Sequence, residues 1–168
     1  ISYCEGATVS PASIYIYISA SSYEPSNGYK YNLKKSPRYF AKNLPIPKPD
    51  EAINLDMVGD KQLSLPIERN SLNFHGQLIR KLWDRAKTLK LDAFKGVVGP
   101  SIYDDHVPLY QYAGIPSVDI IDFRYPNAFD NYWHTIDDIP KNCSPESLGQ
   151  VGMLMIDYIF NRKFYIVP

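Results

Sequence analysis

The sequence lacks the features that mark several common classes of protein. It holds two cysteines, Cys4 and Cys143, which are too few and too far apart for a disulfide framework or a thiolate metal cluster. No run of about 18 apolar residues occurs, and residues 1–5 offer neither a basic start nor an apolar signal core. We therefore expect a soluble chain with no transmembrane segment and no targeting segment.

An excess of charge of one sign is also absent. The 18 Lys and Arg residues balance the 18 Asp and Glu residues, and no long run of like charges occurs. Because nucleic acids and anionic membranes attract clustered basic residues, we expect neither as a partner. The length of 168 residues suits a single domain, 1–168, which buries about 70% of its unfolded surface.

The order of apolar and polar residues predicts alternating strands and helices. β-branched and aromatic residues predict strands over 13–18, 52–58 and 117–121. Short helices are expected over 37–44 and over 105–112, the second capped by Asp105 and ended by Gly114. This order is typical of an α/β fold, and neither an internal repeat nor a linker divides the chain.

Two longer helices are predicted to be amphipathic. Asn70-Ser71 offers N-cap chemistry, and apolar residues then recur every three or four positions over about four turns, at Leu78, Ile79, Leu82, Ala86 and Leu89. Ser144-Pro145-Glu146 predicts a second helix start. One apolar face follows it, made of Leu148, Val151, Met155 and Ile159.

Acidic residues occur at two expected element ends. Asp104, Asp105 and His106 begin the short helix that leads to the strand 117–121, where carboxylates either cap free amides or serve chemistry, and a cap is the commoner role. Asp56 lies inside an otherwise apolar strand. A buried carboxylate needs a partner or a metal, and the alternative is a strand-end aspartate that accepts hydrogen bonds from loop amides.

A third cluster, residues 131–138, follows the strand 117–121 in a loop rich in proline and asparagine. Ligand sites of α/β sheets gather at such strand ends. His134 lies beside Trp133 and before Asp137 and Asp138, which suits a metal ligand next to an apolar wall. A lone loop histidine on the surface is the commoner alternative.

Five segments, taken in this order, resemble the zinc aminopeptidase and glutaminyl cyclase family. They are Leu55-Asp56-Met57-Val58-Gly59, Asp104-Asp105-His106-Val107-Pro108, Gly114-Ile115-Pro116, Tyr132-Trp133-His134-Thr135 and Ser144-Pro145-Glu146-Ser147-Leu148. A sixth, 37–44, is similar to the Gly-Ser-Arg-Tyr-Phe-Ala helix that follows the catalytic loop in these proteins. The resemblance covers nearly the whole chain and corresponds to the C-terminal part of the catalytic domain.

The resemblance implies roles for individual residues. His134 is expected to be a zinc ligand, and Trp133 is expected to line the pocket for the N-terminal residue of the substrate. Asp56 is expected to bind zinc as in the two-zinc aminopeptidases, or to lie just outside the ligands as in the one-zinc cyclases. Asp104 is expected to belong to the carboxylate network that handles the proton, whereas Asp105 and His106 look structural.

The sequence also departs from the family. After the strand matching 13–18, the family has Asp-Gly-Glu-Glu or Asp-Gly-Glu-Asp, whose first acidic residue after the glycine is the general base and whose second binds zinc. Ser21 and Ser22 stand in these places, and a serine hydroxyl does not take up a proton as a carboxylate does. Glu24 replaces them only if the loop follows a different path. The family's upstream aspartate ligand is also expected to be missing.

The implied fold is a three-layer αβα arrangement with a central, mostly parallel sheet, phosphorylase/hydrolase-like, with its N-terminal strands missing. The implied function is zinc-dependent action on peptide N-termini, either release of the first residue or cyclisation of N-terminal glutamine. This chain is expected to be catalytically incomplete, with zinc weak or absent.

Two alternatives remain open. The first is a non-catalytic pseudoenzyme domain that binds a peptide or a partner protein, and the second is a fragment of a longer protein. The relatives implied by the resemblance are typically secretory, periplasmic or extracellular. Missing strands leave an open sheet edge, which predicts self-association.

Overall fold

The computed structural model describes residues 37–44 and 47–161, and nine elements follow one another along this part of the chain. They are α1 (Pro37–Lys42), β1 (Ala52–Asp56), β2 (Leu65–Ile67), α2 (Arg69–Thr88), β3 (Phe94–Val98), α3 (His106–Ala113), β4 (Ser117–Ile121), the 3₁₀ turn η2 (Pro140–Asn142) and α4 (Pro145–Asn161). The predicted strand 13–18, Ser21, Ser22, Glu24 and Cys4 lie outside the described residues.

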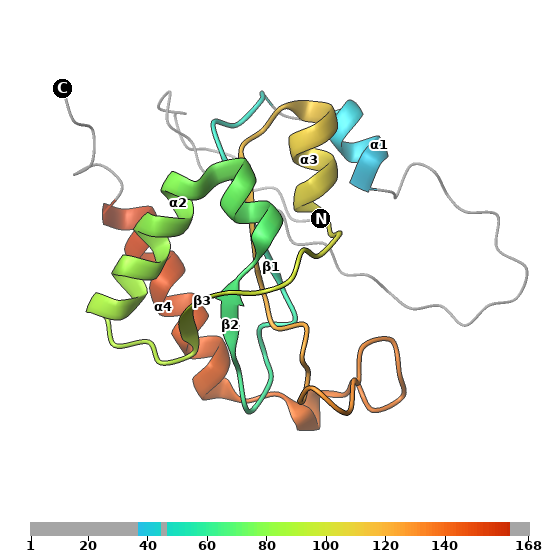
Figure 1. Ribbon diagram of the computed structural model, residues 1–168, viewed down its shortest axis with the longest axis vertical. Coiled ribbons are helices and arrows are strands. Elements are labelled where there is room, and N and C mark those ends of the chain that lie inside the picture. Colours follow the sequence, from blue (N-terminus) through green and yellow to red (C-terminus); the bar gives the residue numbers. More distant parts are fainter. Residues whose placement is uncertain (1–36, 45–46, 162–168) are drawn as a thin grey trace, which may run out of the picture.

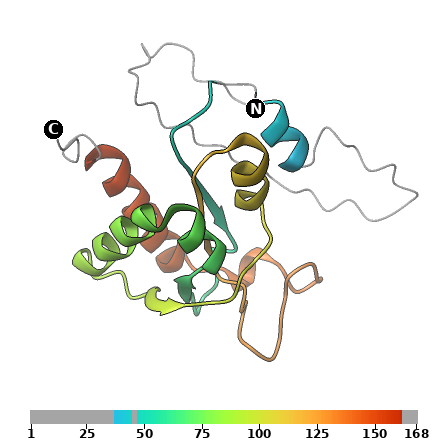
Figure 2. The ribbon, with the colours of Figure 1, turned by 45° about the horizontal axis from the view of Figure 1, so that its top comes forward.

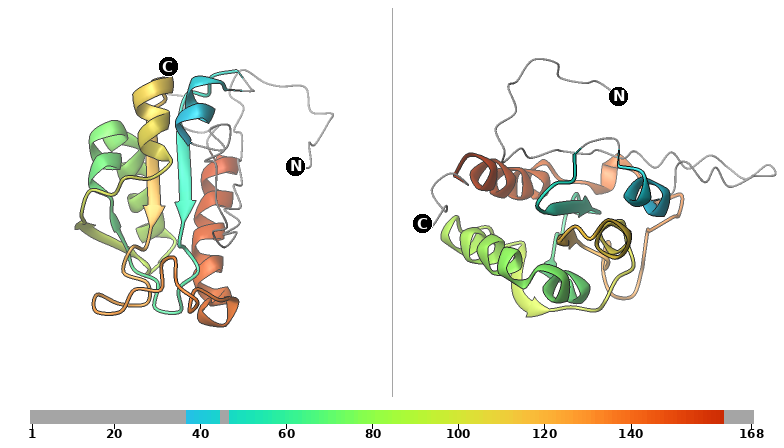
Figure 3. Two further views of the ribbon diagram at one scale, coloured as in Figure 1. Left: turned by 90° about the vertical axis from the view of Figure 1, so that its right-hand side faces the viewer. Right: turned by 90° about the horizontal axis from the view of Figure 1, so that it is seen from above.

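The strands form two parallel pairs. β1 pairs with β4, in a register that sets Ala52 opposite Ser117 and Asp56 opposite Ile121, and β2 pairs with β3. Parallel strands end at the same edge, and in the left view of Figure 3 the arrowheads of β1 and β4 point to the same end. The loop 122–142, drawn in orange, lies beyond these arrowheads. The carboxyl ends of β1 and β4 are therefore next to this loop.

Alternate residues of β4 face different helices, because successive side chains of a strand point to opposite faces. Val118 and Ile120 join a buried apolar cluster with α2 and α4. Ser117 and Asp119 face the other way, toward α3, since the Ser117 hydroxyl donates to the His106 carbonyl. Helices accordingly lie on both sides of these strands, with α2 and α4 on one side and α1 and α3 on the other (Figure 1).

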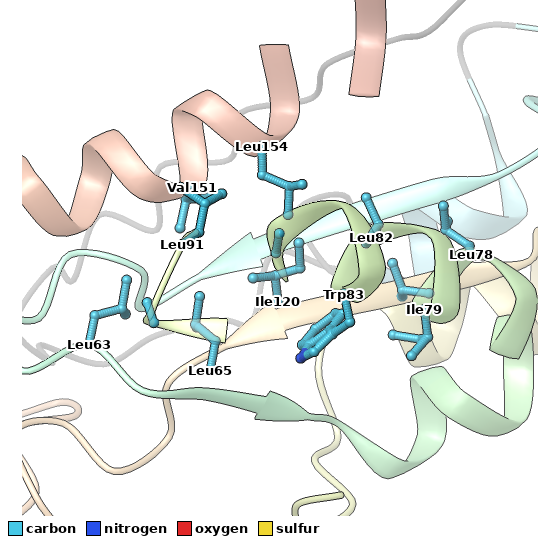
Figure 4. Close-up of a cluster of buried hydrophobic side chains, with 13 residues drawn as sticks. Leu63, Leu65, Leu78, Ile79, Leu82, Trp83, Leu91, Ile120, Val151 and Leu154 are labelled. Carbon is cyan, nitrogen blue, oxygen red and sulfur yellow. The ribbon is translucent and has the colours of Figure 1, made fainter. Parts of the chain in front are cut away.

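The apolar core lies between α2, α4 and the strands. Figure 4 shows side chains of α2 pointing into the same cluster as Ile120 of β4 and Val151 and Leu154 of α4. Several of these side chains have an exposed fraction of 1% or less, including Leu78, Ile79, Leu82, Ile120 and Leu154. Each such buried side chain stabilises the fold by about 1.5–3 kcal/mol. The predicted packing face of the 20-residue helix α2 is confirmed.

The short helix α3 packs against the other face of β4, and α1 lies beside it (Figure 2). The helix α3 ends at Gly114, whose φ of 61° places it in the left-handed region that glycine occupies without strain. This confirms the predicted end of the helix. The side chain of Asp105, in contrast, makes no capping hydrogen bond, so its predicted capping role is wrong.

Several predicted boundaries need correction. The strand predicted over 52–58 ends at Asp56, because Met57 has a φ of 52° and turns the chain. The helix α2 is capped by Glu68 rather than by Asn70 or Ser71: its carboxylate accepts hydrogen bonds from both of their backbone amides. The side chain of Leu148 on α4 is half exposed and does not belong to the packed face.

The strands β2 and β3 were not predicted, because β2 has three residues and four of the five residues of β3 are exposed. Cys143 is a free thiol. Among the described residues, no helix has the length and apolar character that crossing a membrane requires.

Candidate active site

The polar face of the β1–β4 pair positions the candidate site. Asn54 and Asp56 are two residues apart on β1 and so share one face, and Asn54 lies directly opposite Asp119 on β4. The side-chain nitrogen of Asn54 donates to Asp104 Oδ2 and to Asp119 Oδ1, each at 3.0 Å. One amide therefore links two carboxylates, one in the loop before α3 and the other inside β4.

Asp104 lies close enough to Asp56 to affect the ionisation of Asp56. Partial burial, the negative charge of Asp104 and a hydrogen bond with Asp104 raise the pKa of Asp56 to about 6, although the Met57 amide donates to it at 3.0 Å. Asp104 Oδ1 accepts the Asp105 amide at 2.7 Å, which fixes its second oxygen. Asp56 and Asp104 therefore adjoin at the end of β1. The predicted convergence of His134 with these two carboxyl groups stays a prediction.

The loop 122–142 is held by hydrogen bonds from its backbone amides to side chains of the same loop. Asn127 Oδ1 accepts the amides of Phe129 and Asp130, and Asn131 Oδ1 accepts the amide of Trp133 at 2.7 Å. Asp122, at the start of the loop, accepts the amides of Ser64 and Arg124. Asparagine and aspartate favour such turns, which explains why this loop keeps a definite shape without regular secondary structure.

Trp133 and His134 lie on the exposed part of this loop. Their rings stack with centroids 4.1 Å apart, and the Trp133 ring also lies 5.5 Å from that of Phe123. The backbone of His134 has a φ of 58°, a left-handed conformation in which histidine occurs more often than most residues. The exposed fraction of Trp133 is 46%, so an apolar surface beside an imidazole is open to a ligand.

The structure brings together only some of the predicted site residues. Asp56 and Asp104 adjoin, and Trp133 adjoins His134. In residues 37–44 and 47–161, no three His, Cys, Asp or Glu side chains are arranged to hold a metal ion. His134 as a ligand together with Asp56 stays a prediction.

A small cavity lies between the end of β4 and β2. Its volume is about 170 Å³, and its lining includes Ile102, Phe123 and Arg124. Since Phe123 contacts Trp133, the cavity lies next to the candidate pocket wall. A space of this size takes one side chain or a few waters.

A set of polar residues lies behind the site, and we call it the buried polar chain: Asn54, Asp119, His106 and Glu68. The sequence analysis named only His106 among them, as a structural residue, and missed the other three. His106, Asp119 and Glu68 are each at most 1% exposed. Burial raises the pKa of Glu68, but the contact with His106 and the hydrogen bonds from Ile102, Asn70 and Ser71 outweigh this effect and lower the pKa to about 2. Burial and the charges of Asp104 and Asp56 raise the pKa of Asp119 well above its usual value. Polar residues at alternate positions, Asn54 with Asp56 and Ser117 with Asp119, were the available signal.

Residues 33–159 match the model of peptidase family M28, which is well over half of the chain. The chain therefore belongs to peptidase family M28. None of the curated proteins compared with this M28 chain matches it.

Solved structures from bacteria resemble this M28 chain. Glutaminyl cyclase of Porphyromonas gingivalis is 31% identical with a TM-score of 0.71, over 75% of this chain and 48% of that one. A Zn-dependent exopeptidase of Parabacteroides distasonis is 32% identical with a TM-score of 0.69, over 75% and 45% of the two chains. A leucine aminopeptidase precursor of Bacteroides thetaiotaomicron is 30% identical with a TM-score of 0.68, over 74% and 43%. The matched region spans less than half the length of each of these proteins.

Proposed function

We propose that this chain carries part of a zinc centre that binds the amino-terminal residue of a peptide or protein. In this proposal Asp56 and His134 hold the metal, Asp104 handles the proton, and Trp133 forms the wall of the pocket. The observation that carries the proposal is the Asp56–Asp104 carboxylate pair at the end of β1, in a chain of family M28. We also propose that the chain has the complete three-layer αβα fold, with a central, mostly parallel sheet, that the family resemblance implies.

The residues present suit zinc. Carboxylate oxygens and imidazole nitrogens are among its usual ligands. Burial and the neighbouring charge of Asp104 raise the pKa of Asp56, whereas a cation bound beside this carboxyl group favours its charged form. Zinc, when bound at such a site, polarises the carbonyl that is attacked.

The proposed roles of the protein groups follow from their contacts. Asp104 holds both oxygens in hydrogen bonds, from the Asn54 amide and the Asp105 amide, so its orientation is set before any ligand arrives. It lies beside Asp56, so in a catalytically complete site the Asp104 carboxylate would be placed to accept a proton. The half-exposed ring of Trp133 offers an apolar face to the first side chain of the peptide.

We further propose that this chain alone binds N-termini without turning them over. Ser21 and Ser22 stand where the resemblance expects a general base and a zinc ligand, and loss of a general base typically costs about 10²–10⁴ in rate. Without that base, neither hydrolysis nor cyclisation of glutamine proceeds at a useful rate. A non-catalytic peptide-binding role is the form of the function that this substitution favours.

The test is an assay of the purified chain with added zinc, using fluorogenic aminoacyl and glutaminyl peptides. We expect no turnover above that of His134→Ala, and we expect the same peptides to bind in the presence of zinc with an affinity that His134→Ala lowers. Turnover that disappears in His134→Ala contradicts the binding-only role. Zinc-independent peptide binding contradicts the metal centre itself.

A further inference from the structure

The buried polar chain has no part in the proposed zinc centre, yet it reaches Asp104. Asn54 and Asp119 are direct neighbours across the β1–β4 ladder. The Asn54 side-chain amide donates both of its hydrogens to carboxylates, one to Asp104 Oδ2 and one to Asp119 Oδ1. The direction of Asp104 Oδ2 thus depends on an amide whose other hydrogen is held by Asp119.

On its other side, the Asp119 carboxyl group lies against His106. Its second oxygen, Oδ2, lies 3.5 Å from His106 Nδ1, and His106 Nε2 lies 3.2 Å from Glu68 Oε2. Within the described residues, Asp119 Oδ2 and both ring nitrogens of His106 have no well-aligned hydrogen-bond partner. Three fully buried polar atoms therefore have only one another and Glu68 to satisfy them.

Glu68 is a fixed anion at the far end of this chain. Its two oxygens accept four hydrogen bonds, from the amides of Asn70, Ser71 and Ile102 and from the Ser71 hydroxyl, at 2.6–2.9 Å. The Ser71 hydroxyl oxygen also accepts the Asp119 amide at 2.8 Å. Glu68 thus fixes His106 on one side and the backbone of Asp119 on the other.

Asp119 lies in a place that disfavours a negative charge. Burial, and the charges of Asp104 and Asp56 nearby, raise the pKa of its carboxyl group well above the usual value. Its Oδ1 accepts the hydrogen bond from Asn54, and its Oδ2 faces His106 Nδ1. The Asn54 contact therefore uses only one of the two carboxyl oxygens of Asp119.

We propose that Asp119 is a positioning residue for Asp104, acting through the Asn54 amide, and that His106 and Glu68 hold Asp119 in place. The functional part of this inference rests on the proposed role of Asp104 in the zinc centre. Each member of the buried polar chain comes from a different element: Asn54 from β1, Asp119 from β4, His106 from the start of α3 and Glu68 from the cap of α2. The orientation of Asp104 is therefore set by the core of the domain and not by the metal.

Two replacements of Asp119 separate positioning from general stability, because both remove the same charge. In Asp119→Asn, the new amide oxygen accepts from Asn54 and the new NH₂ donates to His106 Nδ1, so the contacts of the buried polar chain are preserved. In Asp119→Leu, an apolar side chain of similar size leaves the second Asn54 hydrogen without an acceptor. The measurement is NMR of the metal-free chain, recording hydrogen exchange of the Asn54 side-chain amide and the carboxyl ¹³C shift of Asp104 at one pH.

We expect the Asn54 exchange rate to stay within about twofold of wild type in Asp119→Asn and to rise more than about tenfold in Asp119→Leu, the size that loss of a buried hydrogen bond of about 1.4 kcal/mol gives. The Asp104 signal is expected to move in Asp119→Leu only. Equal behaviour of the two variants overturns the proposal. If Asp119→Leu does not fold, His106→Gln serves instead: faster Asn54 exchange supports the positioning role, and an unchanged rate contradicts it.

Zinc calorimetry on the same proteins keeps this inference distinct from the proposed function. If the two Asp119 variants differ in Asn54 exchange as expected but the wild-type chain binds no zinc, the zinc centre is contradicted and the positioning role is supported. A chain that binds zinc, but whose Asn54 amide exchanges alike in both Asp119 variants, contradicts the positioning role alone.

Discussion

The two halves of the candidate site differ in how the protein holds them. The carboxylate half, Asp56 and Asp104, is backed by the buried polar chain, whose members lie in β1, inside β4 and at the N-terminal ends of α2 and α3, with His106 and Asp119 fully buried. The loop 122–142 carries Trp133 at 46% exposure and Ile136 at 92%. The carboxylate half is thus fixed by the core before a ligand binds, whereas the His134 half depends on the turns of one surface loop. The two halves should therefore respond very differently to the same mutation.

The largest expected effect comes from replacing a histidine in each half by alanine. In His106→Ala, the Glu68 and Asp119 carboxyl groups lose the group between them, and breaking a buried ionic contact in this way costs about 3–5 kcal/mol. In His134→Ala, an exposed side chain is lost and the cost stays within about 1 kcal/mol. Urea unfolding measures both values, and similar losses in the two variants would show that the halves are not held differently.

A pH-dependent effect of similar size is expected at Glu68. Its folded-state pKa of about 2 lies below the ordinary value of 4.5, so its contribution is fully present above pH 4.5 and is lost as the pH falls through about 2. The shift corresponds to about 3 kcal/mol.

The matched variant is Glu68→Gln, which removes the ionisation and keeps the size of the side chain. We expect it to be about 3 kcal/mol less stable than wild type at pH 7, with a difference that shrinks by about 1 kcal/mol between pH 6 and pH 3.5. Urea unfolding at each pH gives the two curves. A difference that stays constant over this range means that Glu68 is not the fixed anion of the buried chain.

The smallest effect on stability is expected from replacing Trp133, a change that should weaken peptide binding much more than it lowers the free energy of unfolding. Trp133→Ala removes a half-exposed ring from a surface loop and should change the free energy of unfolding by about 1 kcal/mol or less. Peptide binding with zinc present should weaken by about tenfold or more, because an aromatic pocket wall is lost. Ile136→Ala, in the same loop and more exposed, is the control and should leave binding unchanged. Equal weakening in both variants would remove Trp133 from the pocket.

The elements that were predicted correctly from the sequence are those marked by patterns of neighbouring residues. The strand 117–121 was predicted with the boundaries that the structure shows, because a short apolar run follows a helix ended by glycine. The helix α2 was recognised by its period, but its cap was not. Glu68 also accepts the amide of Ile102, 34 positions away in the chain, and nothing local announces such a contact.

The candidate site was predictable only in part for the same reason. The resemblance named Asp56 and Asp104, and the structure shows them together. Asn54 and Asp119 were missed because their contact depends on the register of two strands that are 65 positions apart. Sequence period tells which face of a strand a residue occupies, but it does not tell which residue lies opposite on the neighbouring strand.

Zinc binding tests the central claim most directly. Isothermal titration of zinc into the purified chain should show one site, weakened at least about tenfold, or 1.4 kcal/mol, in both His134→Ala and Asp56→Asn. His75→Ala is the matched control, because it removes a histidine that pairs with Glu51 away from the site, and it should bind zinc as wild type does. Zinc binding that is absent in the wild type, or that is equal in His134→Ala and His75→Ala, would contradict a zinc centre built on Asp56 and His134.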